Sequence, residues 1–109
     1  MSVIADALVT VPTTVIKGQI FEIRTLVRHD MESGFRHTEQ GVRVPRRIIR
    51  EFSCMYNDLE VFRATLYPGT SANPMFVFYC RAEKSGDLVF RWVGDNDYQT
   101  IYRKPILVT

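Results

Sequence analysis

Residues 75–93 read MFVFYCRAEKSGDLVFRWV, and this stretch decides the fold. In each half a bulky apolar residue returns at every second position, and the turn-forming run Ser85–Asp87 separates the halves. A period of two is that of a β-strand with one buried face, because successive side chains point to opposite sides. We therefore predict strands over 75–82 and 88–93, joined by a tight turn that forms a hairpin.

Five other segments share this short apolar or β-branched character and are also bounded by Gly, Pro, Asn and Asp. They cover residues 7–11, 19–28, 48–56, 60–67 and 98–108. Asn57-Asp58 and Gly94–Asp97 are typical of hairpin turns, so we expect consecutive strands to pair. No segment keeps apolar residues at helical spacing over a dozen positions, which leaves little room for helix.

Alternation also assigns the side chains that should face the core. The inward set is Phe21, Ile23, Thr25, Val27, Phe52, Cys54, Tyr56, Phe62, Ala64, Leu66, Phe76, Phe78, Cys80, Ala82, Leu88, Phe90 and Trp92. That volume is enough to fill the space between two packed sheets. The sequence therefore predicts an all-β fold, an immunoglobulin-like antiparallel β-sandwich of about seven strands that forms a single domain over residues 1–109.

Charge and composition exclude several classes of function. The 14 Lys and Arg exceed the 12 Asp and Glu by only two, so nucleic acid is not expected as a partner. No apolar run approaches the roughly 18 residues that span a bilayer, so no membrane insertion is expected. Residues 1–12 show neither a basic leader nor a small-residue cleavage site, so we expect no export signal in the chain itself.

The outward positions of strands 75–82 and 88–93 are unusually apolar. Val77, Tyr79, Val89 and Val93 lie opposite the core set, with Arg81 and Arg91 among them. A strand that is apolar on both faces is expected where a sheet is covered on both sides. Either a protein partner or the chain's own terminal segments would cover the outer face of these strands.

The longest irregular stretch, residues 29–47, is the first place to look for function. Its titratable residues are His29, Asp30, Glu32, His37 and Glu39. Their spacing matches no known metal-ligand or acid–base pattern, so we interpret them as solvated charges and expect no metal, no cofactor and no catalytic residue.

A basic cluster follows in the same stretch, where Arg43, Arg46 and Arg47 surround Val44 and Pro45. Guanidinium groups bind oxyanions and carboxylates, so the cluster is a hypothetical anion-binding or docking patch. The alternative is a solvated strand entry.

The two cysteines, Cys54 and Cys80, are too few for a disulfide framework. Both fall on inward positions, so we expect buried, unreactive thiols, with a bridge across the sandwich as the alternative.

Five segments together resemble the SoxZ family. They are Ile23–His29, Met31–Arg36, Phe62–Ala64, Ser71–Pro74, and Phe78-Tyr79 with Arg81-Ala82, where the intervening Cys80 departs from the family. They occur in the order and at the spacing of that family, and the resemblance extends over roughly residues 18–102.

The resemblance implies an immunoglobulin-like subunit of a periplasmic carrier complex for thiosulfate oxidation. In that complex SoxZ pairs with SoxY, whose C-terminal Gly-Gly-Cys-Gly-Gly arm holds the sulfur intermediate while other thiosulfate-oxidation enzymes dock transiently. Here the sequence ends at Pro105–Thr109 without such an arm, so it resembles the non-catalytic scaffold half. The resemblance further implies a periplasmic location, reached by export with a signal-bearing SoxY.

We accordingly expect no enzyme but a scaffold that binds a SoxY-like subunit. The expected partner interface comprises Met31, Glu32, Phe35, Val77, Tyr79, Arg81, Val89 and Val93. The rival interpretation is a standalone homodimeric immunoglobulin-like interaction module, since one sandwich fold serves many functions. Self-association of the isolated chain is compatible with both.

Overall fold

The structure is a computed structural model that describes residues 7–109. Eight strands make up its regular structure, and no helix in the described part of the chain could span a membrane. The strands are β1 (Ala7–Thr10), β2 (Thr14–Val15), β3 (Ile20–Val27), β4 (Ile49–Tyr56), β5 (Leu59–Thr65), β6 (Met75–Arg81), β7 (Gly86–Gly94) and β8 (Gln99–Val108). Seven of them are the predicted segments, and the two-residue β2 is an addition.

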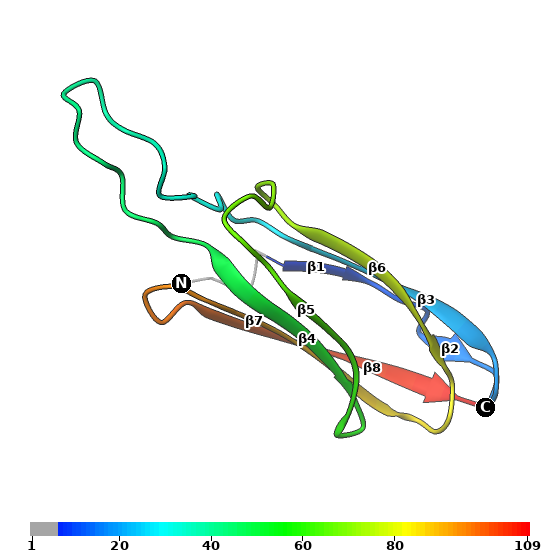
Figure 1. The fold of residues 1–109 in the computed structure, drawn as a ribbon. Helices are drawn as coiled ribbons and strands as arrows, with labels where there is room; N and C mark the ends of the chain where they lie inside the picture. Colours follow the sequence, from blue (N-terminus) through cyan, green and yellow to red (C-terminus); the bar gives the residue numbers. More distant parts are fainter. Residues whose placement is uncertain (1–6) are drawn as a thin grey trace.

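The strands form two sheets that pack face to face (Figure 1). One sheet has the order β1-β3-β6, and the other has the order β2-β8-β7-β4-β5. All neighbours are antiparallel except β2 and β8. This confirms the predicted immunoglobulin-like sandwich.

Two predicted hairpins are present because their turns contain residues that tolerate positive φ. Asn57 and Asp58, with φ of 48° and 69°, connect β4 to β5. Asn96 and Asp97, with φ of 58° and 62°, do the same between β7 and β8. Asn and Asp accept this left-handed conformation more readily than other non-glycine residues.

The third predicted hairpin is wrong, because β6 and β7 lie in different sheets. The residues between them cross from one sheet to the other, and the hydroxyl of Tyr56 fixes the crossing. That hydroxyl accepts hydrogen bonds from the backbone N–H groups of Glu83 and Lys84, at 3.0 and 3.2 Å. It also donates to the Lys84 carbonyl, at 2.7 Å. These bonds satisfy backbone groups that a hairpin ladder would otherwise pair.

The core lies where alternation predicted it. Most of the inward set is buried, while Phe62, Ala64, Phe76 and Cys80 are half-buried. The Phe52 ring joins the two sheets, with its centroid 4.8 Å from that of Phe76 and 5.0 Å from that of Trp92. Packed rings of this kind contribute beyond the area that they bury.

Residues Glu32–Arg47 leave the sandwich as a long, narrow hairpin that we call the finger (Figure 1). Two isolated bridges hold its strands together, Glu32 to Arg47 near the sandwich and His37 to Arg43 near the tip. The finger explains the elongated outline of the molecule, which measures 60 × 27 × 19 Å.

Candidate partner-binding surfaces

The finger is anchored to the sandwich through the carboxylate of Asp95, in the β7–β8 turn. The Arg46 guanidinium donates two hydrogen bonds to it, at 2.9 and 2.8 Å, and the Ile48 backbone N–H donates a third at 3.1 Å. The Arg50 guanidinium lies 3.4 Å away. The Arg46 hydrogen bonds are the main cause of a lowered pKa for Asp95, so the carboxylate stays charged.

The opposite side of the finger root is built into the core. The Asn73 side chain accepts a hydrogen bond from the His29 backbone N–H at 2.9 Å, and Asn73 N–H donates to the His29 carbonyl at 2.8 Å. The His29 ring packs edge-on against Tyr98, with centroids 4.9 Å apart. Met31 is 5% exposed, and its sulfur accepts the Ile49 backbone N–H. Met31 therefore belongs to the core and offers no surface to a partner.

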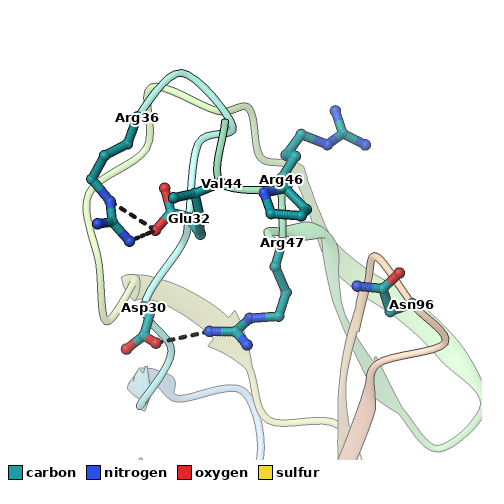
Figure 2. A pocket seen from close by; sticks show the side chains of 8 residues that line it. Asp30, Glu32, Arg36, Val44, Arg46, Arg47 and Asn96 are labelled. Carbon is teal, nitrogen blue, oxygen red and sulfur yellow. Dashed lines mark hydrogen bonds and ion pairs between the residues drawn. The ribbon is translucent and has the colours of Figure 1, made fainter. Parts of the chain in front are cut away.

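An open pocket of about 370 Å³ lies between the finger and the β7–β8 turn (Figure 2). Its lining residues are Asp30, Glu32, Arg36, Val44, Pro45, Arg46, Arg47 and Asn96. Arg36 donates to the Glu32 carboxylate at 2.8 Å, and Arg47 to that of Asp30 at 2.9 Å. The Arg36 hydrogen bond lowers the pKa of Glu32. The pocket is therefore charged but internally paired.

The predicted anion patch is spread along the finger. Arg46 bonds Asp95, Arg47 bonds Asp30, and the Arg43 guanidinium donates to the Gly34 carbonyl at 2.5 Å. An incoming anion has to compete with these acceptors, two of which are carboxylates. The anion-docking role of Arg43, Arg46 and Arg47 stays a prediction.

The finger also carries apolar side chains into solvent. Phe35 is 71% exposed and Val42 is 62% exposed. Apolar side chains on a projecting hairpin have little of their surface buried in the free chain. Aromatic side chains such as Phe35 are frequent contact residues in protein interfaces. Of the three finger-region residues predicted for the interface, Phe35 is exposed, Glu32 is half-buried and Met31 is buried.

The outer face of the three-stranded sheet is the second apolar surface. Cross-strand pairing places Leu8, Leu26 and Met75 in one row, with exposures of 62, 37 and 59%. The neighbouring positions Val77 and Tyr79 are 40 and 63% exposed. No strand within residues 7–109 packs over this face, and exposed apolar side chains grouped in this way often mark an interaction site.

The predicted continuity of this face with Val89 and Val93 is wrong. Both residues lie on β7, in the middle of the five-stranded sheet, and point away from the other sheet. Both are half-buried, Val89 between Met55 of β4 and Arg103 of β8, and Val93 between Glu51 of β4 and Gln99 of β8. Val77, Tyr79 and Arg81 thus occupy one outer surface of the sandwich, and Val89 and Val93 occupy the opposite one.

The cysteines carry free thiols within the sandwich. Cys54 is fully buried, and this burial raises the pKa of its thiol to about 12. Cys80 is half-buried on β6, and burial raises the pKa of its thiol as well. Neutral thiols are poor nucleophiles, so neither residue is suited to carry a sulfur intermediate.

The His and acidic side chains of the 29–47 stretch do not converge. Within residues 7–109, no three His, Cys, Asp or Glu side chains are grouped so as to hold a metal ion. Asp30 and Glu32 pair with arginines, while His37 lies near the finger tip.

Two functional features were absent from the sequence reasoning. The sequence indicates only a turn residue at Asp95, because its partner Arg46 lies 49 positions earlier in the chain. The unpaired edge of β6 was missed because the 75–93 stretch was expected to form a hairpin. The five-residue charged run Glu83–Asp87 was the available signal, since it is long enough to change sheets.

Comparison with solved structures finds the same architecture in other proteins. SoxY, the sulfur carrier protein from Chlorobium limicola f thiosulfatophilum, matches with a TM-score of 0.69 at 11% identity, over 96% of this chain and 80% of that one. The superoxide reductase (neelaredoxin) from Ignicoccus hospitalis matches with a TM-score of 0.73 at 22% identity, over 94% and 80%. At these identities the likeness concerns the fold alone. The search of the curated proteins found no match.

The solved structures show only the fold, and a family model identifies the protein family. The model described as "Sulphur oxidation protein SoxZ" matches residues 9–103, which include all of β2 to β7 and the finger. The predicted resemblance is thereby confirmed over most of the chain. This protein belongs to the SoxZ family of sulphur oxidation proteins.

Proposed function

We propose that this protein is the non-catalytic subunit of a sulfur-carrier heterodimer. Its partner is a SoxY-like subunit with a C-terminal Gly-Gly-Cys-Gly-Gly arm that carries the sulfur during thiosulfate oxidation. The observation that carries the proposal is the pair of exposed apolar surfaces, the finger and the outer face of the three-stranded sheet, in a member of the SoxZ family.

The reactive groups of the chain support a scaffold rather than an enzyme. Cys54 is buried in the core, Cys80 is half-buried, and both thiols have raised pKa values. His29 is 9% exposed and packs against Tyr98 at the finger root. The sulfur-bearing thiol is therefore supplied by the partner.

The mechanism of a scaffold is positioning. By binding the body of the carrier subunit, this chain fixes the root of the arm, and the arm's thiol then samples a limited volume in which docked enzymes meet it. Other thiosulfate-oxidation enzymes bind transiently, and the finger arginines attract their acidic surfaces or the anionic cargo. The complex works in the periplasm, to which this chain is exported together with its partner.

Heterodimer formation is tested by mixing the purified chain with a SoxY-like subunit and measuring mass by light scattering. We expect a 1:1 complex with a dissociation constant in the micromolar range or below. A chain that ignores the carrier and forms only a tight dimer with itself is a homodimeric interaction module, and the proposal is then wrong.

The contribution of the finger is tested with Phe35→Ala. We expect the dissociation constant for the carrier to rise by about tenfold, because exposed aromatic side chains are frequent binding hot spots. Gln40→Ala, at the tip of the same finger, is the matched control and should bind as the wild type does. Equal binding by both variants means that the finger does not contact the carrier.

A further inference from the structure

The four sheet edges of this sandwich are not equally protected. A free edge exposes unpaired backbone N–H and C=O groups and invites another strand, so edges are usually short, bulged or charged. At the edges of this molecule, β1 has four residues, and β2 has two and pairs only with the end of β8. The rest of the β8 edge carries Arg103, Lys104 and Pro105. β5 carries Glu60 and Arg63, and its register against β4 shifts at Met55. Three edges therefore have a recognisable protection.

The fourth edge strand, β6, has none of these protective features: it is neither short nor bulged, and no charged residue lies in its interior. Its sequence, MFVFYCR, contains no Pro and no Lys, and its only charge is at the end. Its register against β3 runs without a shift from Arg81, opposite Ile20, to Met75, opposite Leu26. A regular seven-residue edge of about 23 Å with this composition favours pairing with a further strand.

The backbone groups available for such pairing follow from the ladder. Val27 N–H donates to the Pro74 carbonyl at 3.3 Å, and Ala82 N–H donates to the Gln19 carbonyl at 2.8 Å. Because pairing alternates along an antiparallel strand, the even positions between Pro74 and Ala82 bond to β3. The N–H and C=O groups of the odd positions, from Met75 to Arg81, point to the open side. In the described part of the chain β6 has no second strand neighbour.

The side chains beside this edge are apolar on both faces. Met75, Val77 and Tyr79 are exposed on the outer face. On the inner face Phe62 of β5 stacks on Phe78 at 4.3 Å between ring centroids, and Phe62 remains half-buried at the seam between the sheets.

Exposed apolar side chains lie on β6 and at the ends of β5. Leu59, the first residue of β5, and Tyr67, two residues beyond its end, are 69 and 66% exposed. Met75, Val77 and Tyr79 are 59, 40 and 63% exposed on β6 itself. Apolar side chains grouped on the surface of a monomer often mark an interaction site, so side-chain contacts accompany the addition of a strand at β6.

We infer that β6 is the pairing strand of the heterodimer, to which an edge strand of the carrier subunit adds antiparallel, so that one sheet runs through both subunits. The inference rests on the proposed function and deepens it by naming the contact. The unpaired backbone N–H and C=O groups of β6 can hydrogen-bond to the backbone of an added strand. Apolar side chains on one face of that strand would contact Val77 and Tyr79, and those on its other face would contact Phe62.

Amide hydrogen exchange, measured residue by residue by NMR, tests the pairing in the unmodified chain. In the free chain the amides of Val77 and Tyr79 should exchange fast, while those of Phe76 and Phe78 are protected by β3. Binding of the carrier subunit should slow Val77 and Tyr79 by at least about tenfold. Slow exchange of Val77 and Tyr79 in a monomeric free chain shows that the chain itself covers β6, and the inference is then wrong.

Val77→Pro tests the same contact by mutation. Proline removes the N–H that faces the open side and leaves the β3 ladder intact, so the variant should fold and bind the carrier at least about tenfold more weakly. Ile101→Lys is the control, because Ile101 is exposed on β8 of the five-stranded sheet, outside the finger and the outer face of the three-stranded sheet. It should bind the carrier within about twofold of the wild type.

The outcomes separate the inference from the proposed function. If the wild-type chain binds the carrier but Val77 and Tyr79 stay unprotected, the edge inference fails and the heterodimer stands. If Leu8→Lys, a change on the outer sheet face two strands away from β6, weakens binding as much as Val77→Pro does, the carrier packs on the sheet face and does not pair with its edge. If only a second copy of this chain protects β6, both the inference and the heterodimer are wrong.

Discussion

Asp95 shows how one side chain holds a long loop in place. Its carboxylate receives hydrogen bonds from Arg46 and from the Ile48 backbone, and its side chain is only 13% exposed. Bonds to a charged acceptor are stronger than neutral ones, and removing the acceptor leaves several donors unsatisfied. Asp95 is therefore the charged anchor of the finger, opposite the apolar anchor formed by Met31.

Asp95→Asn should lower the free energy of unfolding at pH 7 by about 1–3 kcal/mol, because the charged acceptor is lost. Asp30→Asn is the matched control, since its partner Arg47 forms an exposed pair worth less than about 1 kcal/mol. Urea denaturation of both variants and the wild type measures the difference. A larger effect for Asp30→Asn contradicts the anchoring role.

The same carboxylate predicts a pH dependence. The pKa of Asp95 is lowered from its ordinary value of 3.8, chiefly by Arg46, so its contribution is complete above the unfolded pKa and is lost as pH falls through the folded one. Between about pH 5 and pH 2 the wild type should lose more stability than Asp95→Asn, and the two should converge. Urea midpoints across this range test the prediction, and parallel curves contradict it.

Thr25 is a buried polar group without a hydrogen-bond partner in the described part of the chain. Thr25→Val should raise the free energy of unfolding by about 1 kcal/mol, because a methyl group replaces an unsatisfied hydroxyl. Thr100→Val is the contrast, since the Thr100 hydroxyl donates to that of Tyr98 at 3.0 Å, and this variant should be destabilised. Thermal denaturation distinguishes the two signs.

At the scale of elements, the finger depends on glycines for different reasons. Gly34 has φ of +88°, and a Cβ there would lie 2.9 Å from the Cβ of Arg46 across the hairpin. Gly41, at the tip, has φ of +83° but nothing within 4 Å. Glycine is thus required at position 34 by the positive φ and by the nearby Arg46 backbone and Cβ, whereas at position 41 only the positive φ requires it.

Gly34→Ala should open the finger, while Gly41→Ala should add only the strain of a left-handed residue, about 1 kcal/mol. The amides of Arg47 and Val44, which bond across the finger, should then exchange faster in Gly34→Ala than in Gly41→Ala. Both variants should keep the protection of the sandwich strands. Equal protection of the finger in the two variants contradicts the role of the close approach.

The strands and their faces were predictable from the sequence, and the sheets were not. Alternation is a local signal, and it placed residues such as Phe52, Phe90 and Trp92 in the core without reference to neighbours. The Asn57-Asp58 turn is equally local. Sheet membership depends on partners distant in sequence, so the crossing after Ala82 was mistaken for a hairpin, and Val89 was assigned to the same surface as Val77.

The candidate site was predictable in part for the same reason. The 29–47 stretch was correctly identified as the longest irregular segment, and Phe35 does lie on its surface. The burial of Met31 was not predictable, because it depends on a φ of 54° and on a backbone N–H of Ile49, which lies 18 residues later.

At the scale of the whole molecule, one phenol links the two sheets. Tyr56 is the last residue of β4, and its hydroxyl binds the segment that leaves the other sheet after β6. Tyr56→Phe keeps the ring, which packs edge-on against Phe21, but removes the acceptor of the Glu83 and Lys84 N–H groups, while the Lys84 carbonyl keeps its bond from the Asn57 side chain. The hydroxyl therefore contributes to the connection between the sheets.

Tyr56→Phe should reduce the free energy of unfolding by about 1 kcal/mol, because two part-buried backbone N–H groups lose their hydrogen-bond acceptor. Tyr102→Phe is the control, since no hydrogen bond is assigned to that hydroxyl in the described residues. Urea denaturation measures both variants, and an unchanged midpoint for Tyr56→Phe contradicts the role given to its hydroxyl.

The finger also changes how the protein behaves in solution. The radius of gyration is 16.3 Å, whereas a globular chain of this length has about 13 Å. A rod-like particle has a higher frictional ratio than a sphere of the same mass, so it sediments slowly and leaves a gel-filtration column early. A monomer of this protein will therefore run as an apparently larger species, and calibration against globular standards will report a dimer where none exists.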